Sequence, residues 1–565
     1  MIRVALILFA LCPSLILPSV ASAKEGAASK PNVLLICVDD LKPLLGCYGD
    51  KIVQSPNIDR LAKRGVLFEK AFCNQAVCSP SRNALLTGLR PQSLGIYDLP
   101  TNFRKSVPDA VTLPQYFKAN GYRAEGLGKI FHVGHGNVND EASWSVPHYS
   151  PKTISYALKE NNPPESTREQ ALFENKKEAW KLPRGAPTEN ADVPDNRYGD
   201  GMIADEAIKR LAAAKAKPEE PFFLAVGFLK PHLPFVAPKK YWDLYDPASF
   251  KLPELQKAPE GAPEFAPSSW GELRQYKDMP DKGPVTKEQA IHLIHGYHAA
   301  TSYMDAQLGK VLDALDANGL AENTIIVLWG DHGWHLGDHG MWCKHTNYEQ
   351  AAHIPLIVAA PGIQGGQRTQ ALVETVDIYP TLTELASLPA PAKLDGLSFA
   401  SVLKNPAASV RDHAIHVYPR TGVIGRAIRT QRHRLIEWKK PGEAPERAIL
   451  ELYDYEADPT ETKNLAASQA EVVAELRKLL ATHPEAKPQI SNQPEPKKAE
   501  TNKSSKQDRG TAFDKRDTNK DGQLTKEEFL VNQPDPDEAP KRFPIFDKDG
   551  NGTLSREEYI KGGKK

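Results

Sequence analysis

The chain has 565 residues, with 71 Lys plus Arg and 71 Asp plus Glu, so its formal net charge is zero. This balance gives no reason to expect a nucleic acid or an anionic membrane as partner. The length exceeds that of one ordinary domain, and we expect two or three domains.

The first 23 residues have the features of a secretory signal peptide. Arg3 precedes an apolar run over 4–17, and Ala21-Ser22-Ala23 supplies small residues for cleavage. The run is too short, and too closely followed by the cleavage site, to predict a transmembrane anchor. We therefore expect an exported protein, periplasmic or secreted, whose disulfide pairing among Cys37, Cys47, Cys73 and Cys343 stays open.

Four short apolar runs predict the strands of an α/β catalytic domain over 31–370. They cover 32–38, 122–126, 222–228 and 324–330. A helical pattern over 287–318, stopped by Gly319, precedes the last run. Proline-rich stretches at 147–198 and 252–285 predict long surface excursions, where substrate-recognition elements often lie.

Ionisable residues follow each predicted strand. In chain order they are Asp39 and Asp40, Lys129 and His132, Lys230 and His232, and Asp331 and His332. One such ending is typical of an ordinary charged loop. Since ligands of open α/β sheets bind beyond the carboxyl ends of the strands, four of them predict one site for an anionic substrate and a metal.

The motif Cys78-Ser79-Pro80-Ser81-Arg82 predicts a helix that begins near Cys78 and ends at Gly88. Pro80 suits the first turn, and Ser79 can cap it. Free N–H groups at a helix start, together with a guanidinium, favour an anion. For the bare motif the alternative is a buried structural cysteine before an ordinary helix.

This motif, continued by Leu85-Leu86-Thr87-Gly88 and Pro91, resembles the signature of the type I sulfatases. Further similar stretches are 38–41, 55–59, 128–132, 230–235 and 331–334, and the likeness spans about 31–470. Within the family the sequence is most similar to the iduronate-2-sulfatase branch. The resemblance implies an alkaline-phosphatase-like fold, with a large mixed, mostly parallel sheet flanked by helices and a smaller C-terminal antiparallel-sheet subdomain.

The resemblance also implies a modified nucleophile. In that family the cysteine is oxidised to formylglycine (3-oxoalanine) by a maturation enzyme, and its hydrated aldehyde attacks sulfur. By this likeness Cys78 is the nucleophile precursor, and it holds one divalent ion together with Asp39, Asp40, Asp331 and His332. Carboxylate oxygens favour Ca²⁺ or Mg²⁺, and the resemblance implies Ca²⁺.

The remaining catalytic roles follow from the same likeness. Arg82 and Lys129 are expected to neutralise the sulfate and the aldehyde hydrate, with His132 assisting regeneration of the aldehyde. His232 and Lys344 are the candidates to bind sulfate and protonate the leaving oxygen, and we prefer His232 because its ordinary pKa suits proton donation near neutrality. Other histidines have no assigned role: 292, 295 and 298 read as members of helix faces, and 335 and 339 stay open.

The C-terminal third predicts three further segments. Alternating patterns indicate an antiparallel-sheet subdomain over 371–487, and residues 488–511 read as a flexible linker. Two complete D-x-[DN]-x-[DN]-G-x5-E loops then predict an α-helical EF-hand pair over 512–562 that binds Ca²⁺. The expected ligands are Asp517, Asn519, Asp521, Gln523 and Glu528 in the first loop, and Asp547, Asp549, Asn551, Thr553 and Glu558 in the second.

We therefore predict a sulfuric ester hydrolase that removes O-sulfate from a sulfated oligo- or polysaccharide, and the resemblance favours the 2-O-sulfate of a uronic acid. Three alternatives remain at this stage. The substrate could be another sulfated polysaccharide, for example an algal one. The enzyme could be a phosphonate monoester or phosphodiester hydrolase, or the protein an inactive glycan-binding protein.

Overall fold

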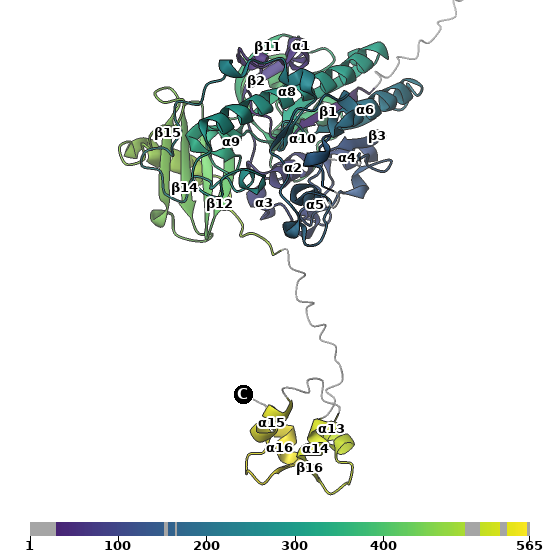
Figure 1. The fold of residues 1–565 in the computed structure, drawn as a ribbon, viewed down its shortest axis with the longest axis vertical. Helices are drawn as coiled ribbons and strands as arrows, with labels where there is room; N and C mark the ends of the chain where they lie inside the picture. The colour runs from purple at the N-terminus through teal and green to yellow at the C-terminus, as the bar shows by residue number, and fades with distance from the viewer. Residues whose placement is uncertain (1–29, 152–155, 164–165, 492–508, 532–538, 562–565) are drawn as a thin grey trace, which may run out of the picture. The chain divides into compact units, whose positions relative to one another are not determined.

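The computed structural model describes residues 30–151, 156–163, 166–491, 509–531 and 539–561. The chain divides into two compact units, Met1–Ile490 and Ser491–Lys565, which are described separately (Figure 1). The predicted signal peptide and most of the predicted linker lie outside the described residues. Within the described ranges, no helix combines the length and the apolar content needed to cross a membrane.

A mixed seven-stranded sheet forms the centre of the first unit, in the order β11-β2-β10-β7-β1-β5-β3. Strands β7, β1, β5 and β3 are mutually parallel, β2 is parallel to β11, and β10 runs antiparallel to both of its neighbours. The predicted mixed, mostly parallel sheet is thus confirmed. The strands are β1 (Asn32–Val38), β2 (Val66–Phe72), β3 (Arg123–Gly128), β5 (Phe222–Phe228), β7 (Thr324–Gly330), β10 (His353–Ala359) and β11 (Gln367–Glu374).

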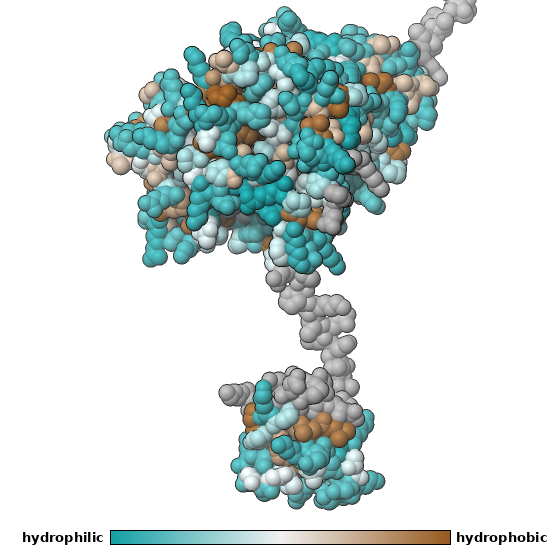
Figure 2. All heavy atoms as spheres, viewed as in Figure 1, coloured by the Kyte–Doolittle hydropathy of each residue, from teal (hydrophilic) through white to brown (hydrophobic). Residues whose placement is uncertain are grey.

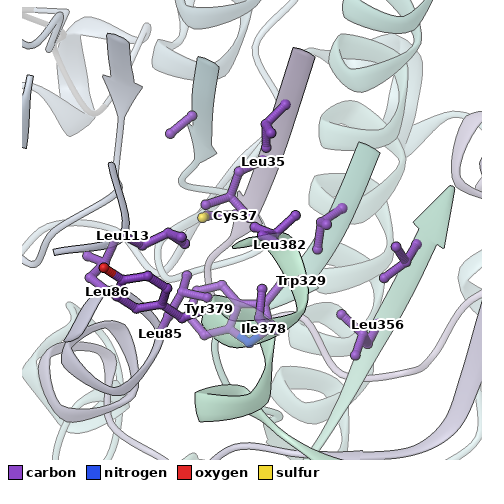
Figure 3. Close-up of a cluster of buried hydrophobic side chains, with 14 of the residues drawn as sticks. Leu35, Cys37, Leu85, Leu86, Leu113, Trp329, Leu356, Ile378, Tyr379 and Leu382 are labelled. Atoms are coloured by element: carbon purple, nitrogen blue, oxygen red, sulfur yellow. The ribbon is translucent and has the colours of Figure 1, made fainter. Parts of the chain in front are cut away.

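Helices cover both faces of this sheet, because alternate side chains of a fully buried strand point to opposite sides. In β1, Leu35 and Cys37 pack with Leu85 and Tyr379 on one face, as Figure 3 shows. Leu34 and its same-face neighbours pack against the other helical layer. On the side drawn in Figure 2 the surface of this unit is mainly hydrophilic, in keeping with these two buried clusters.

Helix α8 is the longest element and runs along the second face of the sheet (Figure 1). Thr286 and Gln289 form a capping box at its start, which satisfies two of the free N–H groups there. The helices of the first unit are α1 (Pro56–Arg64), α2 (Cys78–Thr87), α3 (Pro91–Leu94), α4 (Leu113–Ala119), α5 (Arg168–Phe173), α6 (Gly199–Lys215), α7 (Lys239–Trp242), α8 (Lys287–Ala317), α9 (Glu349–Ala352), α10 (Ile378–Leu385), α11 (Ala400–Lys404) and α12 (Ala470–Leu480).

A four-stranded antiparallel sheet follows, formed by β12 (His413–Arg420), β13 (Val423–Thr430), β14 (His433–Lys439) and β15 (Ile449–Asp454). Helix α12 packs on it through Leu476 and Leu480. Because β11 belongs to the large sheet, the domain boundary that we predicted between 370 and 371 falls inside a strand. Two short pairings of two-residue strands, β4 (Thr188–Glu189) with β6 (Phe235–Val236) and β8 (His335–Leu336) with β9 (Trp342–Cys343), lie in the long loops.

The second unit contains two helix–loop–helix segments. It comprises α13 (Arg509–Arg516), β16 (Gln523–Thr525), α14 (Lys526–Leu530), α15 (Ala539–Phe546), β17 (Thr553–Ser555) and α16 (Arg556–Lys561). The two loops pair through Leu524 and Leu554, and the small core contains Phe513, Phe529 and Phe543. The predicted EF-hand pair therefore has the expected paired-loop architecture.

Most predicted element boundaries agree with the structure. Strands β1, β5 and β7 have the predicted limits, and α8 ends one residue before the predicted 318. Gly88, with φ 67°, ends α2 in the left-handed conformation that favours glycine. Ser79 does not cap α2, however. Helix α2 begins at Cys78 itself, and its N-cap residue is Val77, which has no capping side chain.

Candidate active site

The carboxyl ends of four strands and the start of α2 meet at one place. Asp39 and Asp40 follow β1, Lys129 follows β3, His232 lies beyond β5, and Asp331 and His332 follow β7. The side chains of all of these residues are at least nine-tenths buried. The parallel strands thus bring together groups that are up to 293 residues apart in the chain.

Cys78 is the first residue of α2, and its side chain lies among cations. Its Sγ is 3.4 Å from His332 Nε2 and 3.7 Å from Lys129 Nζ. Burial and the Asp39 carboxylate raise the pKa of this thiol, but the nearby cations outweigh them and hold it well below its ordinary value. The electropositive start of a helix therefore favours an anionic nucleophile or substrate oxygen at this position.

Arg82 lies one turn further along α2 and is fully buried. Its Nε donates to Asp331 Oδ2 at 3.0 Å, and its Nη2 donates to Asp39 Oδ1 at 3.0 Å. Its Nη1 donates to the backbone carbonyls of Lys129 and Ile130. None of these hydrogen bonds reaches Cys78, so the planar guanidinium holds the two carboxylates and the end of β3 in place. Our expectation that Arg82 helps to neutralise the sulfate and the aldehyde hydrate stays a prediction, and its hydrogen bonds to Asp39 and Asp331 add a positioning role.

The predicted metal ligands form a compact cluster. One ligand atom from each of Asp39, Cys78, Asp331 and His332 lies within 4.8 Å of the others, and Asp39, Asp40, Cys78 and His232 make a second such group. His332 Nδ1 lies 3.0 Å from the Gly333 carbonyl, which fixes the ring so that Nε2 faces the carboxylates. Asp331 Oδ1 accepts the backbone N–H groups of both Asp40 and His332 at 3.0 Å.

The charges in this cluster are mutually dependent. Burial raises the pKa of Asp331 to about 7. Burial lowers the pKa of His332, but the Asp331 and Asp40 carboxylates reverse this and raise it to about 9. A cation bound among these ligands would replace that imidazole proton, because metal-ligating histidine is neutral.

His232 and Lys344 both lie next to Asp40. Lys344 Nζ is 3.1 Å from Asp40 Oδ2, and His232 Nε2 is 4.0 Å from the same oxygen. Burial lowers the pKa of His232, but the Asp40 and Asp39 carboxylates outweigh burial and the nearby lysines and raise it to about 10, so the ring carries a proton at neutral pH. Lys230 Nζ donates to the carbonyls of His232 and Pro234 at 2.6 and 2.7 Å, and so fixes this loop.

Glu272 was not predicted from the sequence, yet it joins this pair. Its Oε1 lies 3.1 Å from His232 Nε2, and its Oε2 lies 2.8 Å from Lys344 Nζ. Glu272 comes from the proline-rich excursion over 252–285, where no motif distinguishes it from neighbouring acidic residues. Phe173, at the end of α5, was also missed; its ring lies 5.7 Å from that of His232 and 5.3 Å from Lys129 Nζ.

His132 belongs to the same pocket, with its Nε2 3.2 Å from His135 Nδ1. Burial lowers the pKa of His132, and a hydrogen bond with Cys78 opposes that effect. Three of the other histidines contact structural groups. His335 Nε2 contacts Thr346 Oγ1 at 2.8 Å, and on α8 the His295 and His298 rings contact backbone carbonyls.

The five cysteines among the described residues are all free. Cys37, Cys73 and Cys343 are buried, and burial raises the pKa of each, so they are poor nucleophiles. Cys78 is the described cysteine whose environment lowers its thiol pKa. The charged neighbours of Cys78, and not its burial, distinguish the pKa of its thiol from that of the other cysteines.

The EF-hand loops place their acidic residues as the motif requires. In the second loop, ligand atoms of Asp547, Asp549 and Glu558 lie within 4.8 Å of one another. In the first, Glu528 accepts hydrogen bonds from the Thr518 and Thr525 side chains. Gly522 and Gly552, with φ 81° and 83°, make the sharp turn at the sixth position.

Comparisons with known proteins agree with this fold. Residues 31–388 match the Sulfatase family, residues 337–486 match the N-sulphoglucosamine sulphohydrolase C-terminal family, and residues 510–530 and 541–562 match the EF hand family. Iduronate 2-sulfatase of Mus musculus is 38% identical over 440 residues, which cover 71% of this chain and 78% of that protein.

Solved structures share the fold of the first unit at lower identity. A protein in complex with its substrate D-glucosamine-2-N,6-O-disulfate superposes with a TM-score of 0.65 at 23% identity, covering 80% of this chain and 97% of that one. The phosphonate monoester hydrolase of Agrobacterium radiobacter superposes with a TM-score of 0.63 at 23% identity, covering 80% and 96%. The chain belongs to the sulfatase family and is a sulfuric ester hydrolase with a C-terminal EF-hand pair.

Proposed function

We propose that the protein is an exported, formylglycine-dependent sulfatase that removes the 2-O-sulfate of a uronic acid from a sulfated glycan. The observation that carries the proposal is the setting of Cys78. This residue begins α2 within 3.7 Å of two cationic side chains and belongs to both buried clusters of ligand atoms. The Sγ stands where the oxygens of a hydrated aldehyde would lie.

One Ca²⁺ is proposed to bind Asp39, Asp40, Asp331 and His332 together with residue 78. The donor set fits such an ion, because the two groups of buried ligand atoms share Asp39 and Cys78 and together contain three carboxylates, which supply hard oxygen ligands. When bound, the ion withdraws charge from the sulfuryl oxygens and favours ionisation of the nucleophile. Arg82 holds Asp39 and Asp331 in the geometry that this requires.

Lys129 and His132 are proposed to serve the nucleophile. Lys129 Nζ pairs with Asp39 and lies 3.7 Å from Cys78 Sγ, so its charge stabilises an anionic oxygen at residue 78. His132 carries a lowered pKa, chiefly because it is buried, and can therefore accept a proton at neutral pH. Formation of the aldehyde from Cys78 requires a maturation enzyme.

His232 and Lys344 are proposed to bind the sulfate and deliver the proton to the leaving sugar oxygen. His232 is the better donor because its Nδ1 lies close to the Leu233 carbonyl, which leaves Nε2–H directed at the pocket. Glu272 contacts both side chains and keeps them charged. Its carboxylate at the rim can also accept a hydrogen bond from a sugar hydroxyl next to the ester.

The uronate preference rests on the 38% identity to iduronate 2-sulfatase. The structural likeness to a phosphonate monoester hydrolase supports only the shared fold, because identity there is 23%. The EF-hand pair is proposed to bind Ca²⁺ in a structural role, and the N-terminal 23 residues to direct export.

The test is sulfate release from a panel of disaccharides and oligosaccharides. It uses protein in which conversion of residue 78 to formylglycine has been verified from the mass of its peptide. The panel contains a terminal 2-O-sulfated iduronate, a 6-O-sulfated glucosamine, sulfated algal oligosaccharides and a phosphonate monoester. Release confined to the 2-O-sulfated uronate supports the full proposal. Release only from other sulfated sugars overturns the uronate assignment, and turnover of the phosphonate alone overturns sulfate as the substrate group.

A further inference from the structure

A cavity of about 640 Å³ lies beside the loop that leads to Lys344, separate from the residues of the active site. Its walls come from four segments: 252–257, 270–274, the start of α8 with the residues before it, and 337–342. This volume is in the range that holds a small ligand or one to two sugar rings. Its lining includes Lys257, Arg274, Lys287, Trp270, Trp342 and His339.

The lining of this cavity is cationic. Lys257, Arg274 and Lys287 line it, and no aspartate or glutamate is among its lining residues. Within the described part of the chain, none of the three cations has an ion-pair partner. Asp281, whose charge acts on Arg274, is itself paired with Arg184 at 3.1 Å. Three unpaired cations around one concavity concentrate positive potential and favour an anionic ligand.

Arg274 is held in a fixed position at this cavity. Its guanidinium carbon lies 3.3 Å from the centre of the Trp270 ring. Its three nitrogens donate to the carbonyls of Ser269, Pro280 and Gly283 at 2.9, 2.6 and 2.9 Å. A guanidinium has five N–H donors, so two remain for a ligand. Because the group is already ordered, little conformational entropy is lost when it binds a sulfate or carboxylate.

Two further features face the same cavity. The positive end of the 31-residue helix α8 contributes Thr286 and Lys287 to the wall. His339 is 5% exposed and contacts the Thr460 carbonyl through Nε2, whereas its Nδ1 has no hydrogen-bond partner among the described residues. That nitrogen can still accept a hydrogen bond.

Two segments of the chain connect the cavity directly to the active site. Trp342 precedes Lys344 by two residues, and Trp270 precedes Glu272 by two residues. Two extended residues span about 7 Å. Trp270 and His339 also have positive φ angles of 44° and 54°, a conformation that bulky residues rarely adopt. The same two segments therefore shape both the cavity and the rim of the active site.

We propose that this cavity is a second saccharide-binding site, which holds a sulfated or carboxylated sugar of the same polysaccharide chain away from the unit that loses its sulfate. The cationic lining, the preorganised Arg274 and the unpartnered histidine nitrogen match the acidic groups and hydroxyls of such a sugar. This inference rests on the proposed action on sulfated glycans. It predicts that long substrates bind more tightly than disaccharides.

The test reverses the charge of the two exposed lysines of the cavity in the full chain, with the double variant Lys257→Glu/Lys287→Glu. The matched control is Lys63→Glu/Lys404→Glu, which changes the net charge equally at exposed lysines outside the cavity. Kd is measured by calorimetry in a Cys78→Ala background, for a heparin-derived octasaccharide and for a 2-O-sulfated disaccharide. We expect the cavity variant to raise the Kd of the octasaccharide about tenfold relative to the control. The Kd of the disaccharide should be unchanged, which also shows that the variant is folded.

Equal octasaccharide affinity in the two variants overturns the second site, as does an equal loss for octasaccharide and disaccharide. The corresponding kcat/KM values in the active enzyme separate this inference from the proposed function. If the parent enzyme desulfates the disaccharide but the cavity variant behaves as the control on long chains, only the second site fails. If the parent neither binds nor desulfates any sulfated saccharide, both proposals fail.

Discussion

The buried guanidinium of Arg82 offers the sharpest test of how the site is held together. In Arg82→Lys the charge is kept, but the planar fork that joins Asp39, Asp331 and two backbone carbonyls is lost. A lysine ammonium at the end of a flexible stem cannot satisfy these groups in one geometry, and at least two charge-assisted hydrogen bonds disappear. At about 2 kcal/mol each, the free energy of unfolding should fall by about 4 kcal/mol.

The same change should reduce activity more than a structural effect alone would. Asp39 and Asp331 are proposed metal ligands, and a displacement of about 1 Å there lowers kcat roughly 100-fold. The control is Arg434→Lys, which replaces another fully buried arginine that bonds Glu349 but no residue of the site. Urea unfolding and kcat should show both variants destabilised and only Arg82→Lys inactive. An Arg82→Lys enzyme with kcat near that of the parent would refute this account.

Three further predictions concern charge. Glu349 is buried, which raises its pKa, but Arg429 and Arg434 hold that pKa well below 4.5. Glu349→Gln should therefore lower the free energy of unfolding by about 3 kcal/mol at neutral pH. Because the pKa of Glu349 is lower in the folded than in the unfolded state, this difference in stability between variant and parent should shrink as the pH falls below 4.5. A difference in urea unfolding that stays constant with pH would contradict this. Glu272→Gln removes the anion beside His232 and Lys344, so the alkaline limb of the kcat profile should move to lower pH by about one unit, and an unmoved limb would exclude the proposed contact. Glu558→Gln should weaken one Ca²⁺ site in calorimetry by roughly tenfold or more without changing sulfate release, and loss of activity would contradict a structural role for the module.

Much of the active site could be predicted because its residues directly follow the ends of strands. The apolar runs of β1, β5 and β7 are fully buried, so their ends are clear in the sequence. The first polar residues after them must converge when the strands are parallel. Asp39 and Asp331 are both found next to Cys78 for this reason.

Two parts of the site could not be predicted in this way. Glu272 lies in a long excursion without a periodic pattern, and only the folded loop brings its carboxylate to His232 and Lys344. Arg82 was expected from the family likeness to help neutralise the sulfate and the aldehyde hydrate, and its hydrogen bonds to Asp39 and Asp331 were not predicted. Its burial behind Asp39 and Asp331 depends on how α2 packs, which spacing along one helix does not reveal.

The capping of α2 shows a similar limit. Serine is a favourable N-cap residue, and Ser79 precedes a proline that suits the first turn. The helix nevertheless begins at Cys78, and Ser79 is fully buried within its first turn. Packing of the whole helix in the core, where every residue of α2 is buried, outweighs the local preference.

In the proposed mechanism residue 78 supplies the nucleophile only after its conversion to formylglycine. The most direct measurement compares the sulfate release of one chain prepared with and without a formylglycine-generating enzyme, with the converted fraction of the Cys78 peptide determined by mass spectrometry. We expect a rate of sulfate release proportional to the converted fraction, and no release by Cys78→Ala. Equal rates from converted and unconverted protein would contradict it.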